Sequence, residues 1–576
     1  MAAPATGRRT VSSRGGGRHS RPRPRTAGMD GRIRLLRFVF VVFLVLVGGR
    51  AVALASSSQH LTELAQNQQT KHVDLPAHRG AILDRNGRKL AVGKPQQTVY
   101  ATPYLLEDPV AAADELCAAL QIHRRREQRE VLRALSDEES GFAYVARKVD
   151  PELAKAATAL DLPGVGAYAE EERAYPMKGS AAQVLGFAGI ENRGLAGIEL
   201  LYDKQLAGVS GRETVVRDAE GRALKTTLDK VPVPGTDVRL TLDSVIQLCA
   251  EDALEKTVRR CNARAATAIV MDPRSGEIFA MATVTKEGFH GYGHDRDADR
   301  NRAVTDVYEP GSIFKLVTIS GALADGLITP STKFTLPPSI HVADREINES
   351  HERGTVVYSV REILQWSSNV GAVKIGQLMG KEGLSKWVDA YGFGQPTGIQ
   401  FPGELAGFVP PVDQWSGSSI GNIPMGQGIA VTPLQMAVAF STVANNGVAV
   451  KPRLVAQVGA RVRDRPEKNR VIPARTARQV RSMLALAVAE GTGVQAEIPG
   501  YEVAGKTGTA EIALPNGGGY AKGVYVASFI GMAPADHPRL VVLVAVDGTA
   551  MYGGDAAAPA VQTIMRFALQ YLEIAP

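Results

Sequence analysis

The chain has 576 residues, of which 44% are hydrophobic and 22% charged, as in ordinary globular proteins, and its length predicts two to four domains. Its net charge of +7 comes from one end: residues 1–37 hold ten arginines and one acid (+9), which leaves 7 − 9 = −2 for the rest. The body is therefore not basic, which argues against a nucleic-acid-binding protein. The 3 cysteines, at positions 117, 249 and 261, match neither a disulfide framework nor a zinc site.

The N-terminal end predicts a membrane anchor. Residues 1–32, rich in Arg, Gly, Ser and Pro, are expected to be a disordered cytoplasmic tail. Residues 33–55 are apolar enough to span a bilayer, and the arginines before them favour a cytoplasmic N-terminus. The alternative is a cleaved signal peptide with Ala53-Leu-Ala55 as its cleavage site. Both interpretations export residues 56–576.

Residues 56–232 predict a stalk followed by an elongated, irregular α/β module that supports or docks something. Asp84-Arg-Asn-Gly87 lies between two apolar stretches and is typical of a hairpin turn. We find no catalytic cluster here. Val231-Pro-Val-Pro-Gly235 has the composition of a linker and predicts a boundary, so that residues 233–576 form a second domain.

The sequence pattern of residues 233–576 predicts an α+β fold. Asp243 is placed to cap a helix, and Ala265–Asp272 and Glu277–Val284 predict two strands joined by a turn. Val524–Gly531 and Leu540–Asp547 predict two more, before a closing helix over residues 559–572. Strands at both ends with helices between them favour one antiparallel sheet sandwiched by helices.

The segment Tyr308-Glu-Pro-Gly-Ser-Ile-Phe-Lys-Leu-Val-Thr318 carries the first chemical signal. Pro310 and Gly311 end the preceding chain, and Ser312 opens an apolar run that predicts a buried helix. Ser312 and Lys315 are three residues apart and share one face of a turn. A desolvated lysine has a lowered pKa and can serve as the base that activates a serine hydroxyl.

Two further motifs follow in order. Ser367-Ser-Asn369 places a hydroxyl and an amide two residues apart, a weak signal alone. Val503-Ala-Gly-Lys506-Thr507-Gly508-Thr509-Ala510 is stronger, because a glycine within a strand marks close backbone approach. Its lysine and threonine hydroxyls suit recognition of a carboxylate, and a peptide could add to this edge as a strand.

The three motifs in this order resemble the penicilloyl-serine transferase signature, and the chain is similar to the class B penicillin-binding proteins. The resemblance spans roughly residues 70–573 and includes the segments Arg79–Asn86, Tyr175–Glu199, Arg302-Ala303, Val431–Gln435 and Gly491–Gly493. It implies the family's penicilloyl-serine transferase fold behind an elongated pedestal and a single transmembrane helix. The chain's end and its length favour the division-specific FtsI type. Elongation and sporulation types remain the alternative.

The resemblance also implies the catalytic roles, without a cofactor or metal. Ser312 would attack the D-Ala-D-Ala carbonyl of a peptidoglycan stem peptide and form an acyl-enzyme. Lys315 would be its base, and Lys506 would help to keep Lys315 neutral. Ser367 would relay a proton to the leaving nitrogen, and Asn369 would hold the donor peptide's amide.

Substrate-binding groups follow from the same resemblance. Thr507 and Thr509 would take the terminal carboxylate beside Gly508, and the backbone N–H groups of Ser312 and Thr509 would form an oxyanion hole. β-Lactams would acylate the same serine. The implied location is the bacterial inner membrane with an extracytoplasmic catalytic domain, and the implied partners are an FtsW-like glycan polymerase and other division proteins.

The sequence also allows other interpretations. Gly417-Ser-Ser419-Ile-Gly421 matches the Gly-x-Ser-x-Gly of hydrolases, but no apolar strand precedes it. A D,D-carboxypeptidase, a β-lactamase, or a non-catalytic β-lactam sensor or scaffold on the same domain stays open. His290 and His294 with Asp295 could form a metal cluster, although their Gly- and Asp-rich segment favours a solvated loop.

Overall fold

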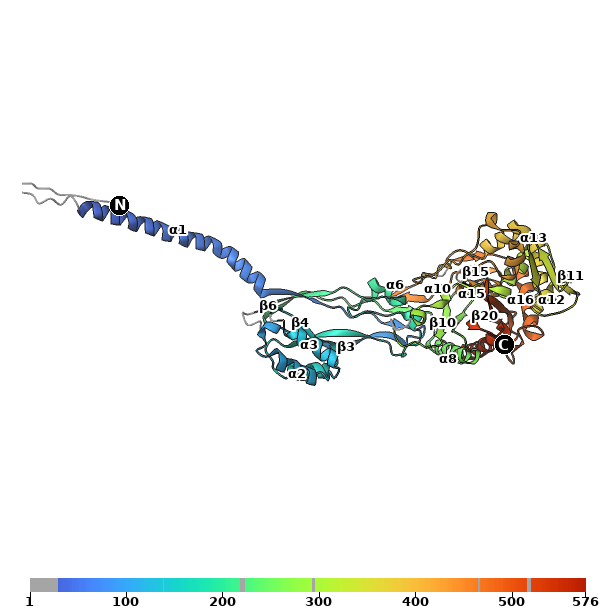
Figure 1. Ribbon diagram of the computed structural model, residues 1–576, viewed down its shortest axis with the longest axis horizontal. Helices are drawn as coiled ribbons and strands as arrows, with labels where there is room; N and C mark the ends of the chain where they lie inside the picture. Colours follow the sequence, from blue (N-terminus) through green and yellow to red (C-terminus); the bar gives the residue numbers. More distant parts are fainter. Residues whose placement is uncertain (1–28, 138, 218–222, 293–295, 465–466, 515–518) are drawn as a thin grey trace, which may run out of the picture. The chain divides into compact units, whose positions relative to one another are not determined.

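The computed structural model describes residues 29–137, 139–217, 223–292, 296–464, 467–514 and 519–576. The chain divides into two units: one contains residues up to 73 together with 213–229, and the other contains residues 74–212 and 230–576. In the first unit, helix α1 (Met29–Gln69) includes Gly31–Leu54, a 24-residue stretch that is long and apolar enough to cross a membrane and contains an 18-residue window of mean hydropathy 2.3 (Figure 1). This stretch contains nearly all of the predicted span 33–55, whereas the predicted tail falls on residues outside the described ones, apart from 29–32 in α1.

A three-stranded sheet belongs mainly to the first unit. Its strands β1 (Thr70–Leu75), β6 (Gly211–Arg217) and β7 (Ala223–Lys230) are ordered β1-β6-β7. The predicted stalk, residues 56–70, is mostly the C-terminal part of α1, which ends at Gln69 just before β1.

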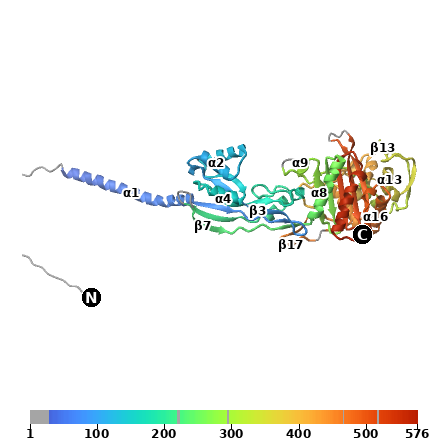
Figure 2. The ribbon, with the colours of Figure 1, turned by 90° about the horizontal axis from the view of Figure 1, so that it is seen from below.

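In the second unit, a larger sheet has the order β17-β16-β8-β2-β3-β4, with β5 also paired to β3. Its strands are β2 (Ile82–Leu83), β3 (Lys89–Ala101), β4 (Ala143–Val149), β5 (Gly166–Ala174), β8 (Val238–Leu240), β16 (Val455–Val458) and β17 (Arg461–Val462). Helices α2 (Pro109–Ala119), α3 (Arg125–Leu135) and α4 (Pro151–Thr158) bury an apolar cluster with β3 and β4 (Figure 2). Because β8 and β16 come from beyond residue 232, one sheet contains strands from both sides of the predicted boundary.

The predicted hairpin at Asp84–Gly87 is confirmed. Strands β2 and β3 pair antiparallel across it, and the Gly87 amide donates to the Asp84 carbonyl over 3.1 Å. Gly87 has φ +84°, which favours glycine. The buried Asp84 carboxylate accepts a 2.7 Å hydrogen bond from Ser244 Oγ, so the turn also fixes the start of α8 (Ser244–Cys261).

The C-terminal part is built on an antiparallel sheet, as the sequence predicted, and this sheet has five strands in the order β10-β9-β21-β20-β19. The strands are β9 (Ala265–Met271), β10 (Ile278–Thr285), β19 (Ala504–Ala513), β20 (Tyr520–Ala533) and β21 (Leu540–Thr549). Along β21, Val542, Val544 and Val546 pack with α8 and α18 (Ala558–Tyr571) on one face. Val541, Leu543 and Ala545 pack on the other with α15 (Pro433–Ala444) and α16 (Ala474–Ala489). Burial on both faces explains why β21 is a continuous apolar run rather than an alternating one.

A helical region lies beside this sheet. It contains α11 (Lys315–Ala324), α12 (Val360–Gln365), α13 (Asn369–Ala390) and α14 (Ser419–Asn422) with the paired strands β11 (Lys333–Leu336) and β14 (Val356–Ser359), and β12 (Ser339–Val342) and β13 (Arg345–Asn348). The remaining elements are α5 (Ala182–Leu185), α6 (Gly197–Leu201), α7 (Asp203–Leu206), α9 (Arg296–Asp299), α10 (Arg302–Thr305), α17 (Gly553–Ala556), β15 (Val448–Val450), β18 (Lys468–Arg470) and the 3-10 turns η1 (Pro103–Leu105), η2 (Gly311–Phe314), η3 (Val412–Gln414), η4 (Ile423–Met425) and η5 (Val494–Ala496).

Candidate active site

The first motif starts with a 3-10 turn, which differs from the predicted α-helical start. Ser312 lies in η2, and the α-helix α11 begins only at Lys315. Side chains three residues apart eclipse one another in a 3-10 turn, so the difference brings the pair together. Lys315 Nζ lies 3.0 Å from Ser312 Oγ. Ser312 is partly exposed, whereas Lys315 is 0% exposed, so substrate can reach the hydroxyl while the amine is desolvated.

The second motif supplies the other partners of Lys315. Its Nζ donates to the Ser367 carbonyl oxygen at 2.6 Å and to Asn369 Oδ1 at 2.8 Å, and lies 3.4 Å from Ser367 Oγ. Ser368 is the N-cap of α13 and accepts from the Gly371 amide. Ser367 has φ +60°, a left-handed conformation that is uncommon for a serine and turns its carbonyl group toward the lysine.

Burial changes the protonation of both lysines. Desolvation lowers the pKa of Lys315 from its ordinary 10.5 to about 7, while the Glu349 carboxylate acts in the opposite direction and raises it. The pKa of Lys506, also fully buried, is lowered well below its usual range by desolvation first and by repulsion from Lys315 second. Desolvation of Lys315 was predicted and is the largest cause of its lowered pKa; Lys506, expected to help keep Lys315 neutral, is not among the causes.

The third motif lies on β19, an edge strand of the five-stranded sheet. Lys506 Nζ donates to Thr507 Oγ1 at 3.0 Å and to the Thr507 carbonyl at 3.2 Å. A Cβ on Gly508 would lie 2.4 Å from Ser528 Oγ and 3.0 Å from the Pro310 carbonyl oxygen, so only glycine fits there. This close approach puts β19 directly against the turn that carries Ser312.

Three residues without a predicted role complete the site. Glu349 accepts hydrogen bonds from Ser368 Oγ and from the backbone N–H of Asn369 in the second motif. Thr492 Oγ1 lies 2.9 Å from Thr507 Oγ1, and the Gly553 amide donates to Thr509 Oγ1 at 3.1 Å. Thr492 falls within a segment that carried the family resemblance, which was its only signal in the sequence. Nothing in the sequence singled out the other two: Glu349 lies in a loop and Gly553 begins α17, and each contacts a motif on a different segment of the chain.

The rejected motifs lie apart from this arrangement. Ser419 begins the short helix α14 and follows η3 and a turn, so the strand required by a nucleophile elbow is missing. His290 Nε2 bonds to the Glu287 carbonyl at 2.7 Å, and its proposed companions His294 and Asp295 lie outside the described residues. Cys249 and Cys261 both lie in α8, and all 3 cysteines are free.

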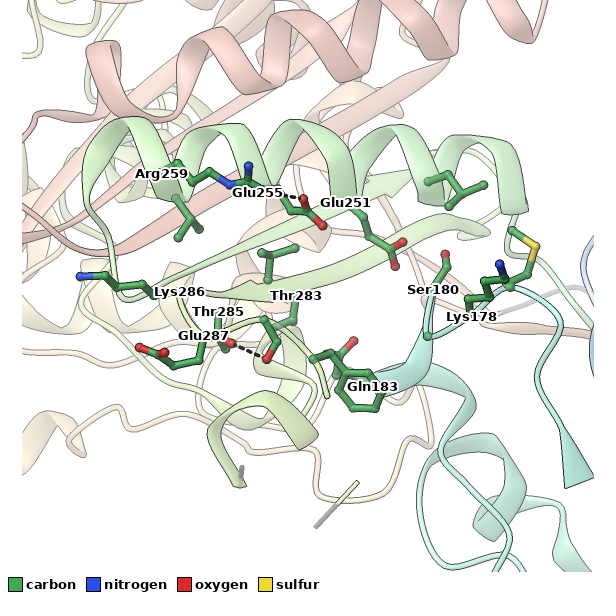
Figure 3. Close-up of a pocket in the computed structure, with 17 residues that line it drawn as sticks. Lys178, Ser180, Gln183, Glu251, Glu255, Arg259, Thr283, Thr285, Lys286 and Glu287 are labelled. Atoms are coloured by element: carbon green, nitrogen blue, oxygen red, sulfur yellow. Dashed lines mark hydrogen bonds and ion pairs between the residues drawn. The ribbon is translucent and has the colours of Figure 1, made fainter. Parts of the chain in front are cut away.

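A polar cavity of about 450 Å³ lies between α8 and residues 177–183 (Figure 3). Its most buried charge is Glu251, whose pKa is raised by desolvation. The Glu251 carboxylate accepts from the Ala181 amide and from Gln247 Nε2, both at 2.8 Å. The cavity shares no residue with the three motifs, and its buried carboxylate is already hydrogen-bonded to the protein, so it is not the catalytic centre.

Comparison with known protein families agrees with this geometry. A family described as "Penicillin binding protein transpeptidase domain" matches residues 266–566, and one described as "Penicillin-binding Protein dimerisation domain" matches residues 74–240. Stage V sporulation protein D of Bacillus subtilis is 34% identical over 557 residues, which cover 94% of this chain and 86% of that protein. Peptidoglycan D,D-transpeptidase FtsI of Escherichia coli is 30% identical over 508 residues, covering 86% and 84%.

Solved structures give the same answer. A crystal structure of penicillin binding protein 3 from Mycobacterium tuberculosis, complexed with aztreonam, is similar with a TM-score of 0.69 and 30% sequence identity, and the match covers 87% of this chain and 98% of that chain. Its fold is the α+β arrangement described above. The transpeptidase match contains all three motifs: the first two meet at Lys315, and the third lies on β19 against the turn that carries Ser312. The chain therefore belongs to the class B penicillin-binding proteins, with both their dimerisation and their transpeptidase domains.

Proposed function

We propose that this protein cross-links peptidoglycan stem peptides during septal cell-wall synthesis, through an acyl-enzyme on Ser312 that β-lactams also form. The observation that carries this proposal is the 3.0 Å contact between Ser312 Oγ and Lys315 Nζ, with the lysine fully buried. A class B penicillin-binding protein is a D,D-transpeptidase that acts on D-Ala-D-Ala ends. The reaction follows from the groups around this contact.

In the first half-reaction, neutral Lys315 accepts the proton of Ser312 Oγ as that oxygen bonds to the carbonyl carbon of the penultimate D-Ala. The developing oxyanion is stabilised by the backbone N–H groups of Ser312 and Thr509. The bond from carbon to the terminal D-Ala nitrogen breaks, and Ser367 Oγ relays a proton to that nitrogen. In the second half-reaction an amine of another stem peptide attacks the ester and releases Ser312.

Recognition of the donor peptide is assigned to β19 and the second motif. Lys506 lies buried behind the strand and donates to Thr507 Oγ1, and the hydroxyls of Thr507 and Thr509 bond to the terminal carboxylate. Asn369 holds the peptide's amide. Because β19 is an edge strand, the peptide can lie along it as an added strand beside Gly508.

The cellular assignment rests on the anchor and on the resemblance to the division branch. The arginines before the apolar stretch favour a cytoplasmic N-terminus and an extracytoplasmic catalytic domain in the inner membrane. An FtsW-like glycan polymerase and other division proteins are the expected partners. The 34% identity to stage V sporulation protein D supports a sporulation role as the second candidate. Depletion in the source bacterium separates the two: filaments without septa support the septal role, and normal division with defective spores refutes it.

The catalytic proposal is tested by intact mass spectrometry of the full chain in detergent after penicillin is added. One adduct per chain that persists, and is absent in Ser312→Ala, is the expected result. Ser419→Ala is the matched control, because it removes the serine of the rejected motif and should leave the adduct unchanged. An adduct that disappears as penicillin is hydrolysed would indicate a β-lactamase, and no adduct on folded protein would refute the assignment of Ser312.

A further inference from the structure

Glu349 is a buried carboxylate with no part in the reaction described above. It directly follows β13, and its side chain is 6% exposed. Burying a carboxylate costs free energy unless it is paired and hydrogen-bonded, so its partners indicate why it is there.

All partners of Glu349 converge on the second motif or brace the carboxylate. Its Oε1 accepts a hydrogen bond from Ser368 Oγ at 2.5 Å, and its Oε2 accepts one from the backbone N–H of Asn369 at 2.8 Å. The guanidinium of Arg353 donates to Oε1. Arg353 is itself fixed, since it donates to the Leu336 carbonyl at 2.9 Å and lies over the Tyr358 ring. The Glu349 carboxylate therefore links Arg353, whose own position is fixed, to Ser368 and Asn369 of the second motif.

The motif needs such support because of its backbone. Ser367 has φ +60°, and a residue other than glycine keeps this conformation only where its surroundings over-determine it. Glu349 fixes the two residues that follow, and the preceding Asn348 accepts from Asn369 Nδ2 at 3.0 Å. The turn held in this way presents the Ser367 carbonyl and Asn369 Oδ1 to Lys315.

We propose that Glu349 is a positioning residue for the acylation of Ser312: its carboxylate holds the Ser367–Asn369 turn in the conformation that receives Lys315. This inference rests on the proposed roles of Ser312 and Lys315. It adds to them a residue that touches neither substrate nor the reacting atoms.

Electrostatics gives the proposal a second consequence. The charges that face Lys315 are Glu349 and Lys506, and the charge that faces Glu349 is Arg353. The Glu349 carboxylate raises the pKa of Lys315 against the effect of burial. Replacing it with a neutral amide removes this attraction, so the pKa of Lys315 should fall and the base should be neutral at a lower pH.

The test compares Glu349→Gln, Glu349→Asp and wild type as full chains in detergent, by the second-order rate of acylation with a fluorescent penicillin over about pH 5 to 9. Glu349→Gln should lower the plateau rate about 10- to 100-fold, the scale expected when a reacting group is displaced by about 1 Å. It should also move the acid limb of the profile to lower pH. Glu349→Asp keeps the charge and should keep the acid limb near its wild-type position.

Glu346→Gln is the matched control, because Glu346 lies on β13 of the same hairpin with its side chain 50% exposed, and it should leave rate and profile unchanged. A folded Glu349→Gln protein with the wild-type rate and profile overturns the proposal. So does a lower rate with an unmoved acid limb and a lower melting temperature, since that pattern marks a merely structural role. A wild-type protein that forms no adduct at Ser312 refutes the proposed function instead, so the two failures are distinguishable.

Discussion

The pH dependence of acylation tests the assignment of Lys315 directly. An ordinary lysine, with a pKa of 10.5, would be neutral in only about one molecule in 3,000 at pH 7, whereas burial lowers the pKa of Lys315 to about 7. The neutral fraction at neutral pH is thereby raised about a thousandfold. Because only the neutral amine accepts the serine proton, the acylation rate should follow that fraction. It should rise about tenfold between about pH 6 and pH 8 and then level off.

The assay is the second-order acylation rate of the full chain with a fluorescent penicillin, with circular dichroism at each pH to confirm that the protein stays folded. Lys315→Arg is the variant that tests the base, because a guanidinium stays protonated throughout this pH range and cannot accept the serine proton. Its rate should be at least about 100-fold lower, the usual scale of general-base catalysis, and should lack the acid limb. A wild-type rate that is flat through about pH 6 to 9, or that rises only near the ordinary lysine pKa, would refute the role of Lys315 as base.

Two further predictions concern a tightly packed glycine and a buried ion pair. Gly508→Ala would place a Cβ 2.4 Å from Ser528 Oγ, so acylation should slow about tenfold or more, and the overpacked site should destabilise the fold by about 1–3 kcal/mol. Glu199→Ala would leave the buried guanidiniums of Arg79 and Arg173 without the carboxylate that now lies 2.7 and 2.6 Å from them. Breaking such a pair should destabilise the fold by about 3–5 kcal/mol, measured by thermal or denaturant unfolding.

Each of these variants has a matched control. Gly383→Ala adds a methyl group where the nearest atom is 3.6 Å away and should leave acylation unchanged. Glu255→Ala removes an exposed ion pair with Arg259 and should change the free energy of unfolding by less than about 1 kcal/mol. If Gly508→Ala acylates at the wild-type rate, β19 does not constrain the serine turn. If Glu199→Ala is as stable as Glu255→Ala, the buried ion pairs of Glu199 with Arg79 and Arg173 do not stabilise the fold.

Much of the catalytic fold was predictable because its signals are local. The apolar runs at 265–271 and 540–547 became β9 and β21, and Asp243 caps α8 by accepting from the Val245 amide at 3.0 Å. The proximity of Ser312 and Lys315 was also predictable, because the two residues lie three apart on one turn. Periodicity and turn chemistry are properties of neighbouring residues, and here they agree with the fold.

What the sequence could not provide depends on contacts between distant segments. Glu349, in the loop after β13, and Gly553, at the start of α17, have neighbours that are set by topology, and an acidic residue after a short strand carries no sign of its partner. The sheet that joins β2 to β8 likewise pairs residues about 150 positions apart, so a linker-like composition at 231–235 did not reveal that the sheet continues across it. The 3-10 start of the serine helix depends on packing against β19 rather than on helix propensity.

The hydrogen bonds of Lys315 connect its burial to its chemistry. A protonated amine has three donors, and three oxygens lie close enough to receive them: Ser312 Oγ at 3.0 Å, the Ser367 carbonyl at 2.6 Å and Asn369 Oδ1 at 2.8 Å. The neutral amine keeps two N–H groups for the two fixed oxygens and turns a lone pair toward Ser312, whose hydroxyl then becomes the donor. Loss of the proton therefore leaves no buried polar group unpaired. Desolvation can therefore lower the lysine pKa without leaving a hydrogen bond unmade, against the opposing effect of the Glu349 carboxylate, and the state that it favours is the one in which the serine proton already points at its acceptor.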